Sequence, residues 1–330
     1  MEQTKVRNTK ENCMAWYGWI RNEGIRHASS SGGVFTAMAE YVLGCGGVVI
    51  GAYFDAKDQV IRHDSTDHVP LAAMRRSKYV ESDMSRAIPL IKEALATKRM
   101  VLFCGTPCQC AGIRKRFGHP QELLLCDFFC HGVPSSLVFK DYLKLKERKR
   151  GAQIADYQFR TKDFGWSQYG IRIDYADGRT EKTVGRCEFF FTAAMMDNQF
   201  LRKSCYTCDK AMYHAADFTI GDFWGINKLA PGKNDNRGIS ILIANTVHAE
   251  QLIPELSKSM EIYPLEKHYL DYAFRVKTAD RKIAQRNERF ELYKKIGIKA
   301  FINQYYRSRL FLSRCMFALR KQRLKMEDAK

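Results

Sequence analysis

Long hydrophobic runs, prolines and acidic residues are all scarce in this sequence. It has 8 prolines among 330 residues, while 45% of the residues are hydrophobic and 12% are aromatic, which excludes a disordered chain and favours a globular protein. No stretch approaches the roughly 18 uncharged apolar residues of a membrane span. The N-terminal segment MEQTKVRNTKENCMAW also lacks the apolar core of a secretion signal. We therefore expect a cytoplasmic protein.

Cysteine is plentiful by comparison, with eleven residues. Cytoplasmic thiols stay reduced, and an odd number of cysteines in a chain of this length does not suit a disulfide framework. Metal binding, redox chemistry and simple burial remain as explanations.

The shortage of acids gives the chain a net charge of +18. The charge is concentrated at residues 307–325, where seven Lys or Arg and no acid alternate with apolar residues, which predicts a basic amphipathic helix. This helix could pack on the body with its cations in solvent, dock on an acidic protein, or make peripheral contact with anionic lipid at the inner face of the membrane. Nucleic acid is not an expected partner, because no recognised binding module accompanies the charge.

Strand and helix patterns alternate along the first half of the chain. Buried strands are expected at 46–54, 100–104 and 123–129, and helices at 84–99, 110–117 and 135–149. After residue 150, alternating segments followed by an Asp-Gly turn at 177–178 predict an antiparallel hairpin. We predict an α/β (mixed α+β) fold: a layered sheet with flanking helices, an antiparallel β-hairpin insertion and a helical basic C-terminus. The predicted division is an N-terminal extension at 1–28, a main domain at 29–265 and a basic helical region at 266–330.

Four cysteines stand in turns and are candidate metal ligands. Cys108 follows a Gly-Thr-Pro turn after one expected strand, and Cys130 follows another. Cys205 and Cys208 form a Cys-Tyr-Thr-Cys pair, whose two-residue gap lets both sulfurs reach one metal centre. Because neighbouring parallel strands end at the same edge of a sheet, the segments can meet. Four thiolates suit structural zinc or an iron–sulfur cube, and the single short-gap pair favours the cube.

The other seven cysteines are expected to be structural. Cys104 and Cys126 lie inside apolar strands, where cysteine acts as a small buried hydrophobe. Cys110 is the alternative to Cys108 as a ligand. It lies inside the following expected helix, however, and is better explained as a core residue. The remaining four are isolated in the sequence: Cys13, Cys45, Cys187 and Cys315.

Three segments have the composition of a binding site. SSSGGVFTAM, residues 29–38, places hydroxyls and two glycines before a helix, whose first N–H groups attract anions, although an ordinary N-cap looks similar. MRRSKYVESD, residues 74–83, gathers three cations beside Tyr79, which suits a diphosphate and a flat ring, although such a run is more often a solvated loop. DFTIGDFWG supplies Asp217 and Asp222, which could cap a helix or orient a ring.

Six ordered motifs together resemble the coenzyme F420 hydrogenase/dehydrogenase beta-subunit family: SSSGGVFTAMAEYVL, MRRSKYVESD, FCGTPCQCAGI, DFFCHGVPSSLVF, SCYTC and FTIGDFWGI. The likeness runs from about residue 29 to 245, with a weaker trace in the tail. It implies an iron–sulfur flavoprotein oxidoreductase that passes electrons between a deazaflavin (coenzyme F420) or other hydride donor, bound FAD and a 4Fe–4S cluster. Residues 29–265 would then be the flavin and iron–sulfur domain.

The resemblance also implies two sets of site residues. The cluster ligands would be the four cysteines in turns: Cys108, Cys130, Cys205 and Cys208. The FAD phosphates would lie at Ser31, Gly32 and Gly33, and the flavin pocket would be lined by Lys78, Tyr79, Gly105 and Thr106. No side chain is named as an acid or base, because the cofactors supply the chemistry.

Many relatives begin with a ferredoxin-like segment, whereas residues 1–28 here hold only Cys13. The resemblance therefore implies a separate redox partner protein, ferredoxin-like or another subunit, together with a small-molecule hydride carrier. Two other functions stay open at this point. One is a zinc-stabilised, non-redox binding or assembly protein associated with surface-polysaccharide biosynthesis. The other is a peripheral membrane or scaffolding component that acts through its basic tail.

Overall fold

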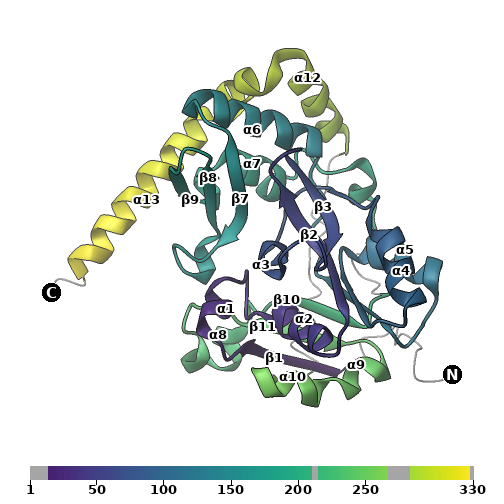
Figure 1. The fold of residues 1–330 in the computed structure, drawn as a ribbon. Helices are drawn as coiled ribbons and strands as arrows, with labels where there is room; N and C mark the ends of the chain where they lie inside the picture. The colour runs from purple at the N-terminus through teal and green to yellow at the C-terminus, as the bar shows by residue number, and fades with distance from the viewer. Residues whose placement is uncertain (1–13, 210–214, 267–282, 328–330) are drawn as a thin grey trace.

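A computed structural model describes residues 14–209, 215–266 and 283–327. Its centre is a nine-stranded mixed sheet (Figure 1). In spatial order its strands are β12 (Met260–Pro264), β1 (Met14–Ile20), β11 (Ser240–Ala244), β10 (Phe218–Asp222), β6 (Leu123–Phe128), β5 (Val101–Cys104), β2 (Val48–Asp55), β3 (Val60–Ser65) and β4 (Ser82–Asp83). A three-stranded antiparallel sheet holds β7 (Ile154–Thr161), β8 (Gly170–Tyr175) and β9 (Thr180–Val184). The predicted fold class is confirmed.

Helices flank both sheets. They include α1 (Glu23–His27), α2 (Val34–Gly44), α3 (Leu71–Met74), α4 (Ala87–Ala96), α5 (Pro107–Phe117), α6 (Ser136–Arg150), α7 (Phe189–Phe191), α8 (Ile226–Leu229), α9 (Val247–Gln251), α10 (Ile253–Ser259), α12 (Ile283–Tyr305) and α13 (Arg307–Glu327). The helix α12 is kinked at Gly297, whose φ of 76° lies in the left-handed region that favours glycine.

Four neighbouring strands, β10, β6, β5 and β2, run parallel to one another. Their side chains enter two cores on opposite faces of the sheet. Val49 and Leu102 pack with α2, whereas Val48 and Val101 pack with α4 and α5. Burial on both faces explains why β5 and β6 are apolar runs without polar alternation. The carboxyl ends of β5, β6 and β10 lie at one edge of the sheet, so the turns that follow them come together.

The strand β1 lies inside the large sheet, between β11 and β12, and is antiparallel to both. Its sequence, MAWYGWI, belongs to the segment that was predicted to be an N-terminal extension at 1–28. Gly18 is required at this position because a Cβ there would lie 2.0 Å from the carbonyl oxygen of Glu261 in β12. The described part of that segment therefore contributes a strand to the sheet.

The small sheet packs with α6, α7, α12 and the start of α13 around an aromatic core. Phe139 in α6 contacts Tyr157 and Phe159 in β7, with ring centroids 5.1 Å apart in both pairs. The turn from β8 to β9 passes through Gly178, whose φ of 81° agrees with the predicted Asp-Gly turn.

The C-terminal helix α13 projects away from the rest of the molecule (Figure 1). Its first turns are tied to the body by Arg309, which pairs with Asp197 at 2.6 Å, and by Arg314, which donates to the carbonyl of Cys187 at 3.3 Å. Four large apolar residues of this helix are more than half exposed: Phe311, Leu312, Met316 and Leu319. Among the helices in the described ranges, none combines the length and apolar character that crossing a membrane requires.

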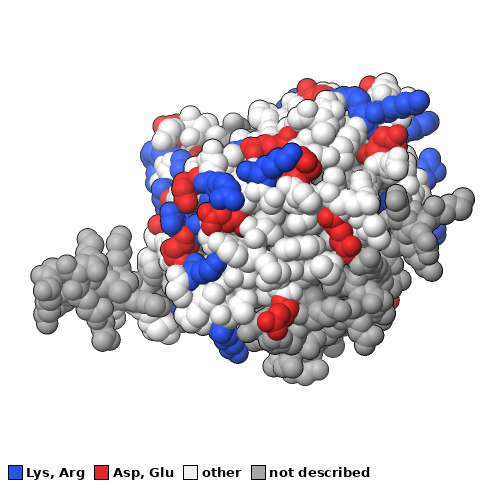
Figure 2. Space-filling view, turned by 90° about the horizontal axis from the view of Figure 1, so that it is seen from below, with Lys and Arg blue, Asp and Glu red and all other residues white. Residues whose placement is uncertain are grey.

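Charged side chains of both signs are intermixed on the face shown in Figure 2, beside broad uncharged surface. Pairs such as Lys258 and Glu255 in α10, 2.7 Å apart, neutralise each other locally. The net charge of +18 therefore does not gather into one basic patch on the described part of this face.

Asp217, immediately before β10, is buried and holds the parallel strands together. Its carboxylate accepts hydrogen bonds from Arg114 in α5 (2.7 Å), from the backbone N–H of Leu125 in β6 (2.8 Å) and from Thr246 (3.2 Å). One carboxylate thus connects two neighbouring strands, a helix and the segment after β11. Hydrogen bonds to a buried charge are strong, and removing one partner leaves the other unpaired.

We expect Asp217→Asn to lower the free energy of unfolding by about 3 kcal/mol, because the Arg114 guanidinium stays buried without its counter-charge. Urea denaturation followed by circular dichroism measures the change. The control is Glu255→Gln, which removes an exposed ion pair with Lys258 and should cost less than about 1 kcal/mol. Equal effects of the two substitutions would show that Asp217 does not hold the sheet.

Candidate functional site

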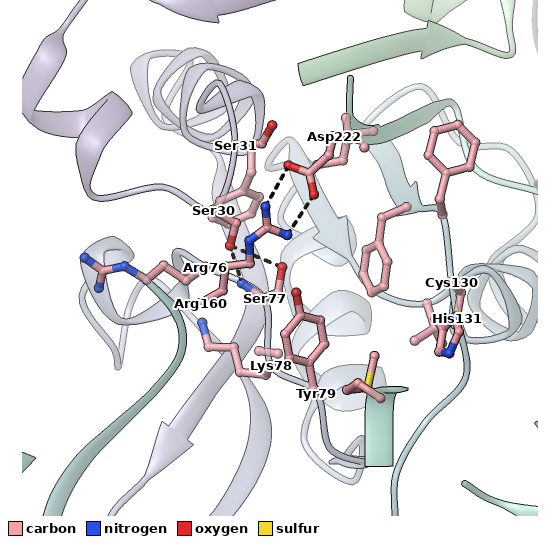
Figure 3. Close-up of a pocket in the computed structure, with 18 of the residues that line it drawn as sticks. Ser30, Ser31, Arg76, Ser77, Lys78, Tyr79, Cys130, His131, Arg160 and Asp222 are labelled. Carbon is pink, nitrogen blue, oxygen red and sulfur yellow. Dashed lines mark hydrogen bonds and ion pairs between the residues drawn. The ribbon is translucent and has the colours of Figure 1, made fainter. Parts of the chain in front are cut away.

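A cavity of about 1210 Å³ lies at the carboxyl edge of the parallel strands, between the large and the small sheet. It is lined by the residues before α2, the segment after α3, the turns after β5, β6 and β10, and residues of the small sheet (Figure 3). Six of the seven predicted cofactor-binding residues line it: Ser31, Gly33, Lys78, Tyr79, Gly105 and Thr106. Gly32 is the exception. The cavity thus brings together motifs that are far apart in the sequence.

The serines before α2 fix the shape of that segment. Ser31 donates to the carbonyl of Ile239 at 2.8 Å, and Ser30 accepts the backbone N–H of Ser77 at 2.8 Å. These hydroxyls are therefore engaged with the protein. An anion at this place would instead meet the first backbone N–H groups of α2, which have no partner within the helix.

Packing explains both glycines of this segment. Gly32 faces the sheet, where a Cβ would lie 2.3 Å from the carbonyl oxygen of Gly18, and its N–H donates to Ser240 at 2.8 Å. Gly33 has a φ of 94°, and a Cβ on it would meet Ile20 at 2.7 Å. Gly32 thus allows β1 to approach closely, and its contact with a phosphate stays a prediction.

Two cations from the MRRSKYVESD segment line the cavity. Lys78 donates to the carbonyls of Ala73 (2.9 Å) and Arg75 (2.5 Å), and burial lowers the pKa of Lys78 to about 7 against an opposing effect of Asp156. Arg76 has a φ of 71°, a conformation that is costly for a residue with a side chain. Its buried Nε has no hydrogen-bond partner in the described part of the chain. An anion in the cavity would supply an acceptor.

A third cation, Arg160 in β7, pairs with Asp222 at the end of β10 at 2.8 Å (Figure 3). Burial is the largest single influence and opposes the charge of Arg160, but the Asp222 carboxylate together with Tyr79 and Tyr169 outweighs it, so that the pKa of Arg160 is raised. The guanidinium lies 4.0 Å from the ring centroid of Tyr169. Asp222 also accepts the indole N–H of Trp166 at 2.8 Å, and Trp166 stacks on Trp224 with centroids 4.5 Å apart. The ion pair of Arg160 and Asp222 thus supports an aromatic wall, in which Tyr169 and Trp224 line the cavity and Trp166 stacks on Trp224.

The Gly-Thr-Pro turn after β5 is a helix cap. Thr106 accepts the backbone N–H of Gln109 at 3.4 Å, and the side chain of Gln109 accepts the N–H of Thr106 at 2.9 Å. Pro107 occupies the first turn of α5, where a missing N–H costs nothing. The sulfur of Cys108 lies 3.1 Å from the hydroxyl oxygen of Thr106. The cap therefore fixes the backbone at Cys108 and the direction in which its side chain starts.

The four predicted ligand cysteines come from three segments and lie within electrostatic range of one another. Burial raises the pKa of Cys130 to about 12, and negative charge on the other three thiols, Cys205, Cys108 and Cys208, adds to the shift. Cys205 accepts the N–H of Val133 at 3.4 Å, which ties its loop to the turn after β6. In the described ranges, no three His, Cys, Asp or Glu side chains form a group that could hold a metal ion. A shared metal centre stays a prediction.

The remaining cysteines divide into three groups. Cys110 and Cys126 are fully buried in the cores, as expected. Cys104 was expected to be a buried filler, but it is only partly buried and lines the cavity, because it is the last residue of β5. Of the isolated cysteines, Cys187 is buried, Cys45 and Cys315 are exposed, and Cys13 lies outside the described residues.

Two residues of the cavity wall, Arg160 and His63, carry no local sequence signal. Arg160 is one of many arginines and stands in a hairpin strand, and His63 belongs to a strand of alternating polarity. Their positions in the cavity depend on tertiary contacts with Asp222 and with the carbonyl of Cys104.

The fold is that of a hydrogenase-complex chain. The structure matches a chain of the F420-reducing [NiFe] hydrogenase complex from Methanosarcina barkeri with a TM-score of 0.54 and 17% sequence identity, over 89% of this chain and 95% of that one. At this identity the likeness concerns the fold alone.

The family follows from the sequence. Residues 98–267 match the family described as the C terminus of the coenzyme F420 hydrogenase/dehydrogenase beta subunit. This is more than half of the 330 residues, and the chain belongs to the coenzyme F420 hydrogenase/dehydrogenase beta-subunit family, as its six motifs predicted. No curated protein matches the chain.

We expect the lowered pKa of Lys78 to make stability depend on pH. The unfolded chain keeps the usual lysine pKa of about 10.4, so between pH 7 and 10 the unfolded state holds the extra proton and native stability rises with pH. Lys78 contributes up to about 1.4 kcal/mol per pH unit to this rise in the free energy of unfolding, and Lys78→Met should remove that contribution. Urea denaturation of both proteins at pH 7, 8 and 9 tests this. Parallel curves would mean that Lys78 is charged in the folded protein.

Proposed function

We propose that this protein is an oxidoreductase that passes electrons between a hydride carrier, bound FAD and a 4Fe–4S cluster, and then to a partner protein. The carrier is coenzyme F420 or another small hydride donor. One observation carries the proposal: Cys130 lines the cavity and also belongs to the group of four thiols. A ring in the cavity and a cluster at the thiols would therefore be neighbours, as electron transfer between them requires.

The cavity offers FAD a charged end and an apolar end. The first N–H groups of α2 and the guanidinium of Arg76 suit its two phosphates. Tyr79, which lies edge-on to Phe191 with centroids 5.7 Å apart, belongs to the part that suits the flat ring. Ordinary small-molecule pockets measure roughly 300–1,000 Å³. A cavity of about 1210 Å³ has room for a dinucleotide together with part of a hydride carrier.

The chain's own residues bind and position, while the cofactors react. When bound, FAD would supply two-electron hydride chemistry and a cluster would supply one-electron transfer, while the residues of the cavity and the four cysteines would hold and orient the two groups. A cube takes four thiolates, with one sulfur for each iron. The proposed ligands supply that number and kind of donor: Cys108 in the first turn of α5, Cys130 after β6, and Cys205 and Cys208. The ion pair of Arg160 and Asp222 keeps the aromatic wall in place.

We expect anaerobically prepared protein to be brown, with about four irons and one flavin per chain, as one cube requires. Cys205→Ser removes a ligand and should lower the iron content at least twofold. The matched control is Cys45→Ser, which changes an exposed cysteine and should leave iron unchanged. Metal analysis and the visible spectrum measure both.

Two outcomes of that experiment would contradict the assignment. Equal iron loss in Cys205→Ser and Cys45→Ser would mean that the ligands were chosen wrongly. Colourless protein that contains zinc would support the zinc-stabilised binding or assembly protein instead.

We also propose that α13 docks the redox partner. Leu312, Met316 and Leu319 are spaced to lie on one side of the helix, and each is more than half exposed. An exposed apolar stripe on a projecting helix marks an interaction surface. Residues 307–325 carry seven Lys or Arg and no acid, so an acidic ferredoxin-like protein is the partner that fits.

We expect the double substitution Leu312→Glu and Met316→Glu to slow electron transfer to an acidic ferredoxin at least fivefold, because it replaces apolar contact with like-charge repulsion. Flavin and iron contents should not change. The control is Ile88→Glu, at an exposed apolar residue of α4. Unchanged transfer to the ferredoxin, together with loss of binding to anionic lipid vesicles, would assign α13 to the membrane surface instead.

A further inference from the structure

His63 is a buried histidine in the wall of the cavity. It belongs to β3, and its side chain is 1% exposed. The imidazole stacks on Phe103, with ring centroids 5.3 Å apart and an interplanar angle of 22°. Its Nε2 lies 3.1 Å from the carbonyl oxygen of Cys104. The imidazole is thus held by stacking on one face and by a hydrogen bond at Nε2.

The contact of Nε2 decides the state of the other nitrogen. A carbonyl oxygen can only accept a hydrogen bond, so Nε2 carries the proton. Burial lowers the pKa of His63 to about 4, against an opposing effect of the hydrogen bond to Cys104. The imidazole is therefore neutral near pH 7, and its Nδ1 presents a lone pair.

This Nδ1 atom is buried and has no hydrogen-bond partner in the described part of the chain. An unpaired buried acceptor costs about 1–3 kcal/mol. Phenylalanine would stack on Phe103 equally well without that cost. A histidine is favoured here only when something donates to Nδ1, and because His63 lines the cavity, a molecule in the cavity is the available source.

The surroundings of His63 define what this molecule presents. Lys78 lies close enough for its charge to lower the pKa of His63 further. Two of its N–H bonds go to the carbonyls of Ala73 and Arg75, and its ammonium form has a third donor. A neutral acceptor does not suit the linking phosphates of a dinucleotide, because these are fully ionised near pH 7 and have no proton to donate. An acceptor beside a donor instead matches the edge of a pyrimidinedione, in which one N–H is flanked by two carbonyl groups. Flavins and deazaflavins both carry this edge.

We propose that Nδ1 of His63 accepts a hydrogen bond from the ring N–H of a pyrimidinedione in the cavity and so orients the ring of the flavin or of the deazaflavin carrier. The inference rests on the proposed function and names the residue that recognises the ring edge. His63 takes up no proton or electron in this role. It fixes which edge of the ring faces β3.

The test compares ligands that differ only at the ring nitrogen. Flavin-free full-length protein is titrated with FAD and with N3-methyl-FAD, and fluorescence quenching gives the dissociation constants. Methylation removes the donor and should weaken binding to the unsubstituted protein about tenfold or more, because Nδ1 is left unpaired. In His63→Phe, which keeps the stacking partner but lacks the acceptor, both ligands should bind within about twofold of each other. The same pair of titrations is made with 8-hydroxy-5-deazariboflavin and its N3-methyl form.

Two further variants show whether a loss of discrimination in His63→Phe comes from misfolding. His248→Phe changes a histidine of α9 that does not line the cavity, and it should keep the full discrimination. His63→Gln retains an acceptor oxygen and should keep part of it. Discrimination in the unsubstituted protein needs no variant at all, so equal affinity for methylated and unmethylated forms of both rings overturns the proposal.

The outcomes also separate this inference from the proposed function. A His63-dependent penalty for FAD assigns the contact to the flavin, and one for the deazaflavin assigns it to the carrier. If FAD binds but methylation has the same effect in His63→Phe, the role of His63 is wrong while the proposed function stands. If neither FAD nor the deazaflavin binds, the proposed function fails first.

Discussion

The parallel pairing of β5, β6 and β10 is the constraint on which the site depends, because it places three turns at one edge of one sheet. The first turn leads into the capped start of α5, the second to Cys130 and the third from Asp222 to Trp224. If one of these strands ran the other way, its turn would lie at the opposite edge. Asp217 holds the pairing from inside, since its carboxylate bonds to β6 and to α5. The cavity therefore exists mainly because these three strands run in the same direction.

Local patterns were sufficient for the buried strands β2, β5 and β6 and for the turn at Gly178, because apolar runs and turn formers are signals within a few residues. They were not sufficient for β1, which becomes a strand through pairing with β11 and β12. The family motifs identified the segments that line the cavity. Gly32 is the exception, because it packs against β1 and does not line the cavity. Arg160 and His63 could not be found in this way, since Asp222 and the Cys104 carbonyl that hold them are far away in the sequence.

The cations of the cavity differ in what compensates their burial. Arg160 has Asp222 beside it, so its charge is maintained by the fold itself. For Arg76 and Lys78, burial is the largest influence and lowers the pKa of each. Asp156 opposes this shift for both residues without outweighing burial, and a buried charge that is only partly compensated is unfavourable. The segment that bears them, with its left-handed backbone at Arg76, is therefore better suited to an anionic ligand than to the stability of the ligand-free chain.

The cysteines divide in a similar way between stability and function. Cys110 and Cys126 contribute to the cores as small apolar side chains. The four proposed ligands are less buried than these two, and they come from three segments that are far apart in the sequence. Cys130 alone of the four also lines the cavity, so the proposed cluster and a ring bound in the cavity would be neighbours.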